Sequence, residues 1–213
     1  MRAARFSGDR VYRYTLDIEF DSGIGVLNFI MLNPSTADEF KNDPTVERCE
    51  RRARAWGYRW LTVTNLFAFR STDPRAMKAA VDPVGPENDA AILDAARTSD
   101  LVIAAWGNHG IHRGRAGTVC QSLRSQHVRL RCLRVASTGQ PCHPLYLPYE
   151  LEPIDYGGIV PNTQRGWIGL LPANDARLDF DARSRITVRR STASRCPAGD
   201  GRIRAYAAKT DGG

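Results

Sequence analysis

A short apolar segment that runs through a polar loop into a capped helix constrains the fold of this chain most. Residues 26–32 are almost entirely apolar, and residues 33–42 are rich in Asn, Ser, Thr and Asp. Asp43 and Pro44 then form a helix start, because Asp is a favoured N-cap and Pro fits the first helical position. Open α/β sheets bind ligands on loops of this kind, whereas a plain turn with capping polar residues is the alternative. We expect the functional site on this loop.

The same pattern recurs along the chain and predicts its fold class. Apolar strand segments alternate with helical segments, the strands at 26–32, 60–67, 101–106 and 130–135 and the helices at 44–56, 74–80, 86–97 and 114–126. Such alternation indicates βαβ units and a mainly parallel sheet covered on both faces. We therefore expect an α/β protein, a three-layer α/β/α sandwich with a mainly parallel four-stranded central sheet over residues 8–156. Residues 11–20 alternate apolar and polar side chains, which predicts a further, antiparallel strand at an edge, and 130–135 is expected at an edge too.

The C-terminal part of the sequence differs in character. Of the net charge of +7, residues 157–213 contribute +5, with 10 Lys and Arg against 5 Asp and Glu. Periodicity fades there, apart from a possible hairpin at 178–190, so we expect a basic extension that adds little to the core. Basic residues are the electrostatic footprint of nucleic-acid binding, although here they gather outside the predicted domain.

The cellular compartment is indicated by what the sequence lacks. No apolar run approaches the roughly 20 residues needed to cross a bilayer, and the basic N-terminus is not followed by the apolar stretch of a secretory signal. The five cysteines are an odd number without close pairing, which argues against a disulfide framework. We expect a cytoplasmic protein with no membrane partner. The sequence does not indicate an oligomeric state.

Three polar side chains stand where predicted strands or their loops end. They are Asn33, Asn65 and His143, and His143 is held in an extended conformation by Pro144. Because the carboxyl ends of parallel strands share one rim, we expect all three to converge on one pocket. Structural roles remain open for each: a turn Asn bonded to its own backbone, an Asn satisfied by a neighbouring loop, and a capping or core His.

The segment after the third strand is a candidate anion site. Gly107 to Gly110 precede a basic stretch and a helix, so Asn108, His109 and Arg113 are candidates for holding a phosphate beside backbone N–H groups. The Gly-Lys-Ser/Thr ending of a P-loop is missing, and a tight turn with a solvated basic face is the alternative.

Metal and serine-nucleophile chemistry are not favoured. Histidines and cysteines are present, but their spacings match no common zinc site, and there is no Cys-x-x-Cys pair. The Gly-x-Ser-x-Gly elbow of serine hydrolases is missing too. We expect neither a metal nor another cofactor.

Several motifs, taken together and in order, resemble the bacterial domain-of-unknown-function family 1643 over about residues 8–156. They are Met31–Asp38, Asp43–Thr45, Thr64–Arg70, Asp82–Asp89, Ala105–Gly110 and His143–Leu147. That resemblance implies no settled activity.

A more distant resemblance is to the uracil-DNA glycosylase superfamily. Leu32–Pro34 is similar to the Ile-Asn-Pro-Gly motif, Thr64–Arg70 to the Thr-Asn-x-x-x-x-Arg segment, and His143–Leu147 to the His-Pro-Ser/Ala-Tyr-Leu motif. The departures are Ser35 in place of the closing Gly, the missing iron–sulfur cysteines, and Leu147-Pro148-Tyr149 in place of the Leu-Arg wedge. The last departure puts duplex DNA in doubt as the substrate.

The distant resemblance implies hydrolysis of the N-glycosidic bond of a modified or deaminated base in nucleic acid. On this hypothesis Asn33, with Asp38, places the attacking water, and His143 supports the departing base. Asn65 reads the base edge, and Phe40 or Phe67 stacks on the ring. Two other hypotheses stay open: a non-catalytic nucleotide or nucleic-acid binding module, and a hydrolase of free nucleosides or nucleotides.

Overall fold

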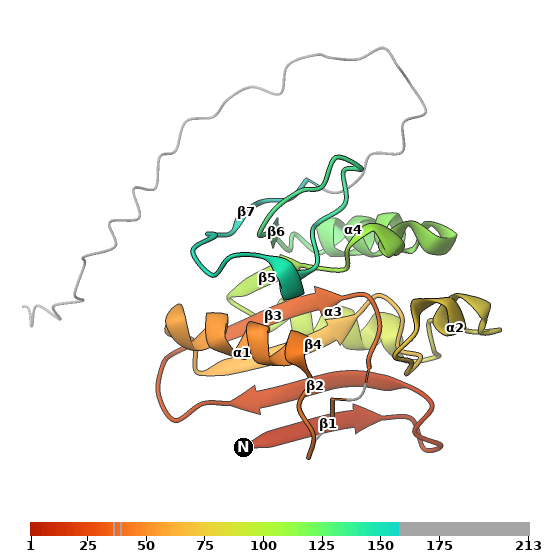
Figure 1. Ribbon diagram of the computed structural model, residues 1–213, viewed down its shortest axis with the longest axis horizontal. Coiled ribbons are helices and arrows are strands. Elements are labelled where there is room, and N and C mark those ends of the chain that lie inside the picture. The colour runs from red at the N-terminus through yellow and green to blue at the C-terminus, as the bar shows by residue number, and fades with distance from the viewer. Residues whose placement is uncertain (36, 39, 158–213) are drawn as a thin grey trace, which may run out of the picture. The chain divides into compact units, whose positions relative to one another are not determined.

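A seven-stranded sheet forms the centre of the molecule in the computed structural model, which describes residues 1–35, 37–38 and 40–157 (Figure 1). These residues belong to one compact unit that spans residues 1–165. In chain order the strands are β1 (Arg2–Phe6), β2 (Arg13–Glu19), β3 (Val26–Met31), β4 (Trp60–Asn65), β5 (Leu101–Ala104), β6 (Leu130–Cys132) and β7 (Ile154–Asp155). In space they follow the order β1-β2-β4-β3-β5-β6-β7.

The four central strands β4, β3, β5 and β6 run parallel, as the sequence predicts, and the outer pairs are antiparallel. The sheet has more strands than the four expected, because the short strands β1 and β7 extend its two edges. β1 pairs with β2 from Arg2 opposite Ile18 to Phe6 opposite Arg13, so β2 is not an edge strand. β7 likewise covers β6. Each added strand gives partners to backbone groups that an open edge would leave unpaired.

The four predicted helices are present, with two short 3-10 helices. They are α1 (Pro44–Ala55), α2 (Pro74–Ala79), α3 (Asn88–Arg97) and α4 (Arg115–Ser125), with η1 (Asn108–Gly114) and η2 (Pro144–Tyr146). Asp43 caps α1, because its Oδ1 accepts the backbone N–H groups of Thr45 and Val46, each at 2.9 Å. The segment 107–110, expected as a loop, instead leads into η1.

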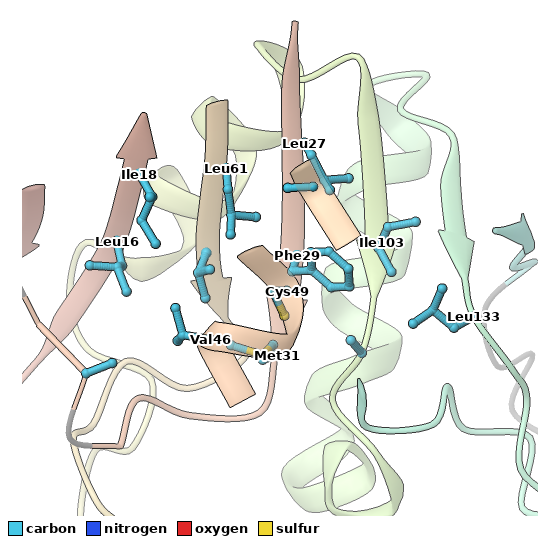
Figure 2. Close-up of a cluster of buried hydrophobic side chains, with 14 of the residues drawn as sticks. Leu16, Ile18, Leu27, Phe29, Met31, Val46, Cys49, Leu61, Ile103 and Leu133 are labelled. Carbon is cyan, nitrogen blue, oxygen red and sulfur yellow. The ribbon is translucent and has the colours of Figure 1, made fainter. Parts of the chain in front are cut away.

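The helices cover both faces of the sheet, which makes three layers. On one face α1 packs Val46, Cys49 and Ala53 against apolar side chains of β2, β3, β4 and β5 (Figure 2). On the other face α2, α3 and α4 cover a second core that includes Ile30 of β3 and Val102 of β5. Figure 1 shows α1 in front of the sheet and α3 behind it. Burial on both faces explains why the central strands read as apolar runs.

Two sequence expectations concern regions beyond this description. The predicted hairpin at 178–190, and the extension from residue 158 onward, lie outside the described residues. In the described part of the chain, none of the helices combines the length and the apolar character that crossing a membrane requires.

Candidate functional site

A cavity of about 450 Å³ opens at the carboxyl ends of β3 and β5. This volume lies within the range of small-molecule sites. Its walls come from the loops after these strands, the start of α1, the segment before α2, and the chain before η2. The lining residues are Arg13, Met31, Leu32, Asn33, Ser35, Asp43, Thr45, Ser71, Thr72, Pro74, Trp106, Gly107, Asn108, His109 and His143.

Asn33 lines the cavity and its amide is fixed by the backbone. Its Nδ2 donates to the carbonyl of Ser71 at 2.7 Å and to that of Pro34 at 3.1 Å. Both bonds use the amino group, and Oδ1 has no hydrogen bond to the described residues. A fixed carboxamide with a free acceptor is suited to hold a water or a ligand donor.

His143 lines the same cavity and presents a defined tautomer. Its Nδ1 accepts the backbone N–H of Leu145 at 3.4 Å, a long bond that assigns the proton of a neutral ring to Nε2. Burial lowers the pKa of His143 below its ordinary value, while the negative charge of Asp43 acts in the opposite direction. At neutral pH the side chain is therefore an uncharged imidazole with an Nε2–H donor.

Two arginines of α1 hold the segment that carries His143. Arg48 donates through Nε to the carbonyl of Pro144 at 3.2 Å. Arg52 donates through Nη2 to the carbonyls of Leu147 at 2.9 Å and Pro148 at 2.8 Å. Arg52 is 1% exposed, although the helical pattern places the arginines of α1 mostly away from its buried face. It shares the carbonyl of Leu147 with Arg48, whose Nη2 also donates to it.

The turn after β5 supports His143 from the other side. Gly107 has a φ of 69°, and its N–H donates to the carbonyl of Pro141 at 2.9 Å. A Cβ added at Gly107 would lie 3.5 Å from the Cβ of His143. The positive φ favours glycine here, and the neighbouring strand end thus sets the position of the histidine backbone.

Arg13 reaches the cavity and Asn65 does not. The Asn65 side chain is 1% exposed, and its Oδ1 accepts from Nη2 of Arg13 at 3.5 Å. Arg13 also donates through Nη1 to the carbonyl of Ala37. Burial lowers the pKa of Arg13 to about 10, so the guanidinium still carries its charge at neutral pH. The predicted convergence therefore holds for Asn33 and His143, and Arg13 stands where Asn65 was expected.

The start of α1 contributes a carboxylate that was expected only as a helix cap. Asp43 lines the cavity beside Thr45, and its two hydrogen bonds to backbone N–H groups both use Oδ1. Of the two oxygens, Oδ2 makes no hydrogen bond to the described residues. Asp43 and the buried Arg13 are the charged residues that sequence reasoning missed.

The three residues expected to hold a phosphate do not lie at one site. Asn108 and His109 line the cavity, but Arg113 does not. Asn108 accepts through Oδ1 from the hydroxyl of Thr138 at 2.6 Å, and Nδ1 of His109 lies 3.1 Å from Nζ of Lys78. Arg113 instead donates to the carbonyls of residues 80 and 81, both at 3.2 Å.

Asp38, Phe40 and Phe67 lie outside the cavity. Asp38 accepts through Oδ1 from the N–H groups of Phe40 at 2.9 Å and Lys41 at 2.8 Å, and these bonds lower the pKa of its carboxyl. Phe40 is 91% exposed. Phe67 is fully buried, with its ring centroid 5.7 Å from that of His112. Each of the three therefore has a structural environment distinct from the Asn33–His143 cavity.

Comparison with known proteins places the chain by family alone. No curated protein and no solved structure matches it. Among the described residues, no group of three or more His, Cys, Asp and Glu side chains is placed to hold a metal ion. Residues 13–145, well over half of the chain, match the family described as "Protein of unknown function (DUF1643)". The chain belongs to this family.

Proposed function

We propose that this protein hydrolyses the N-glycosidic bond between a modified or deaminated base and its sugar. The observation that carries the proposal is that a neutral Nε2–H donor on His143 and a free acceptor on Asn33 line one cavity. The motif likeness to uracil-DNA glycosylases around the same two residues supports it. The substrate belongs to nucleic acid or to a free nucleotide, and no metal takes part.

In this reaction His143, Asn33 and Asp43 each have a separate role. The bond between C1′ and the base nitrogen breaks, its electron pair stays on the base, and the sugar becomes oxocarbenium-like. The N–H of His143 donates to the base as negative charge develops on it, and the imidazole remains neutral. Asn33 holds a water through Oδ1, the oxygen of that water bonds to C1′, and Asp43 receives its proton. The Asp43 carboxylate also stabilises the cationic sugar.

Arg13 supplies recognition in this scheme. Its guanidinium donates to a carbonyl oxygen of the base, and Asn65 positions it from behind through the 3.5 Å contact. Nδ2 of Asn65 is buried and has no partner within the described part of the chain, so a bound water would satisfy it. Asn65 thus affects base choice through Arg13 and not by direct contact.

A nucleotide-binding module without catalysis is the second candidate. It is favoured by Asp43, because one of its oxygens is already occupied by two backbone donors at the α1 cap. Only Oδ2 is left to take a proton from water. A site with that restriction suits ligand binding as well as hydrolysis.

Base release is the decisive assay. The wild-type protein is incubated with single-stranded and duplex oligonucleotides that carry uracil, other modified bases or mismatches, and with the matching free nucleotides. Loss of one preorganised donor typically lowers the rate about 100- to 1000-fold, so His143→Ala should show a loss of that size with little change in binding. His143→Gln keeps an N–H donor and should recover part of the rate.

Two results would contradict the proposal. Equal rates for the wild type and His143→Ala would remove the histidine from the chemistry. Binding of nucleotides at the cavity without release of any base would establish the binding module instead.

A further inference from the structure

A second cavity, of about 600 Å³, adjoins the first. The two share Ser35, Ser71 and Thr72 as lining residues, so they meet at these residues. Hydrogen bonds fix this boundary: the N–H of Ser71 donates to the carbonyl of Pro34 at 2.9 Å, and the carbonyl of Ser71 accepts from Asn33 at 2.7 Å. Ser71, which lines both cavities, therefore also holds Asn33 of the first cavity.

Among the described residues, the lining of the second cavity has three cationic side chains and one carboxylate. The cations belong to Arg10, Lys41 and Arg70, and the carboxylate is that of Asp38. Asp38 directs Oδ1 to the backbone N–H groups of Phe40 and Lys41. The excess of positive charge favours an anionic ligand.

Arg70 is positioned in advance of any ligand. Its guanidinium carbon lies 4.9 Å from the ring centroid of Phe6, and its Nη1 donates to the carbonyl of Arg10 at 3.2 Å. The guanidinium carbon of Arg10 lies against the same ring at 3.9 Å. Nε of Arg70 is buried without a partner within the described residues, and Nη2 makes no hydrogen bond to them. A fixed guanidinium with unused donors is the form in which arginine binds phosphate.

Lys41 adds an exposed cation to the lining of this cavity. Its side chain is exposed, and its ammonium has no hydrogen bond or ion pair with the described residues, while its backbone is tied to Asp38 in both directions. The backbone of Lys41 is thus fixed, while its ammonium group is available to a ligand. Such a lysine binds phosphate as a point charge.

We propose that the second cavity is a phosphate subsite that holds the phosphoryl group of the nucleotide whose base occupies the first cavity. The inference rests on the proposed function and names its substrate class: a phosphorylated compound, not a bare nucleoside. The phosphate is either the monoester of a free nucleotide or a diester of a single strand. Arg70 gives the directional hydrogen bonds and Lys41 gives charge.

Calorimetric titration of the full-length protein tests this subsite. The ligands are the nucleosides of adenine, guanine, cytosine, thymine and uracil, their 5′-monophosphates, and short single-stranded oligonucleotides of the same bases. Charge-assisted hydrogen bonds should make the phosphorylated ligand bind about 10-fold more tightly than its nucleoside. Lys41→Gln and Arg70→Gln should remove most of this advantage. Arg97→Gln, at the exposed end of α3, removes an equal charge elsewhere and should keep it.

The outcomes separate the two proposals. If phosphate adds no affinity, or if Lys41→Gln and Arg70→Gln bind like the wild type, the subsite is refuted and base release can still stand. If affinity depends on these residues but no base is released, the subsite stands and the hydrolase fails. Absence of binding by every ligand refutes the subsite, and the base-release assay with modified bases then decides the proposed function. Tighter binding of oligonucleotides than of monophosphates assigns the diester source, and the reverse assigns the free nucleotide.

Discussion

Replacing Gly110 by alanine should destabilise the fold, because the added methyl group would clash with Trp106, which lines the first cavity. A Cβ at this position would lie 2.1 Å from Cδ1 and 2.7 Å from Nε1 of Trp106, far inside contact distance. Trp106 is 1% exposed and cannot move outward, and its Nε1 donates to Oε1 of the buried Gln140 at 2.9 Å. The methyl group must therefore displace the tryptophan and weaken this bond.

The size of the effect follows from these contacts. Overpacking of a tight core costs about 1–3 kcal/mol, and a buried acceptor left without its donor costs about 1–3 kcal/mol more. The lower backbone entropy of alanine returns about 0.5–1 kcal/mol. The net loss of unfolding free energy is about 1–5.5 kcal/mol, which lowers the melting temperature by about 2–22 °C in a chain of this size.

Urea unfolding and thermal melts of the full-length protein measure this loss. Gly117→Ala is the matched control, because Gly117 lies inside α4 and a Cβ there would meet nothing within 4 Å. The control should be neutral or slightly stabilising. A Gly110→Ala protein that melts within one degree of the wild type would refute the packing argument, and with it the assignment of Trp106 as a rigid wall.

Two further predictions concern pH and the C-terminal extension. The pKa of His143 is lowered on folding, so the folded state binds fewer protons than the unfolded chain just below pH 6.5, and stability should fall as the pH falls through that interval. Asp43→Asn should lower the His143 pKa further in an NMR titration, since it removes the opposing negative charge and keeps a capping side chain; an unchanged pKa would contradict the proximity of the two groups. A chain that ends at Gly157 retains the hydrogen bond from the Tyr156 hydroxyl to the carbonyl of Gly139, and should melt within a few degrees of the full chain. A larger drop would show that residues 158–213 support the fold.

The central sheet was predictable because its signals are local. Continuous apolar runs mark the buried parallel strands, and the pairs Asp43-Pro44 and Asp73-Pro74 mark two helix starts by their own chemistry. β1 was not predicted, because residues 2–6 alternate between partly and fully exposed side chains and carry no apolar run. The pairing of β1 with β2 is a tertiary event that local patterns do not encode.

The site was predictable only where a motif also fixes geometry. His143 is held extended by the following proline, and Asn33 follows the carboxyl end of β3, so both line the cavity. Arg13 gave no signal, because an arginine in an alternating strand is expected on the solvent face. Its burial depends on Ala37 and Asn65, two partners that are distant in sequence. The role of Asn65 could not be fixed for the same reason, because its partner Arg13 lies in another strand. Asp38 bonds its own loop, which its sequence allowed as the alternative to a catalytic role.

Helix α1 positions two walls of the cavity, which limits where its ligand specificity can be changed. α1 brings Asp43 and Thr45 at its first turn, and through Arg48 and Arg52 it also holds the segment after His143. The spacing between the carboxylate and the imidazole therefore behaves as a rigid-body property that survives shifts of the helix as a whole. The facing wall at residues 71–74 belongs to a separate segment. Substitution there is expected to change ligand preference while Asp43 and His143 keep their spacing.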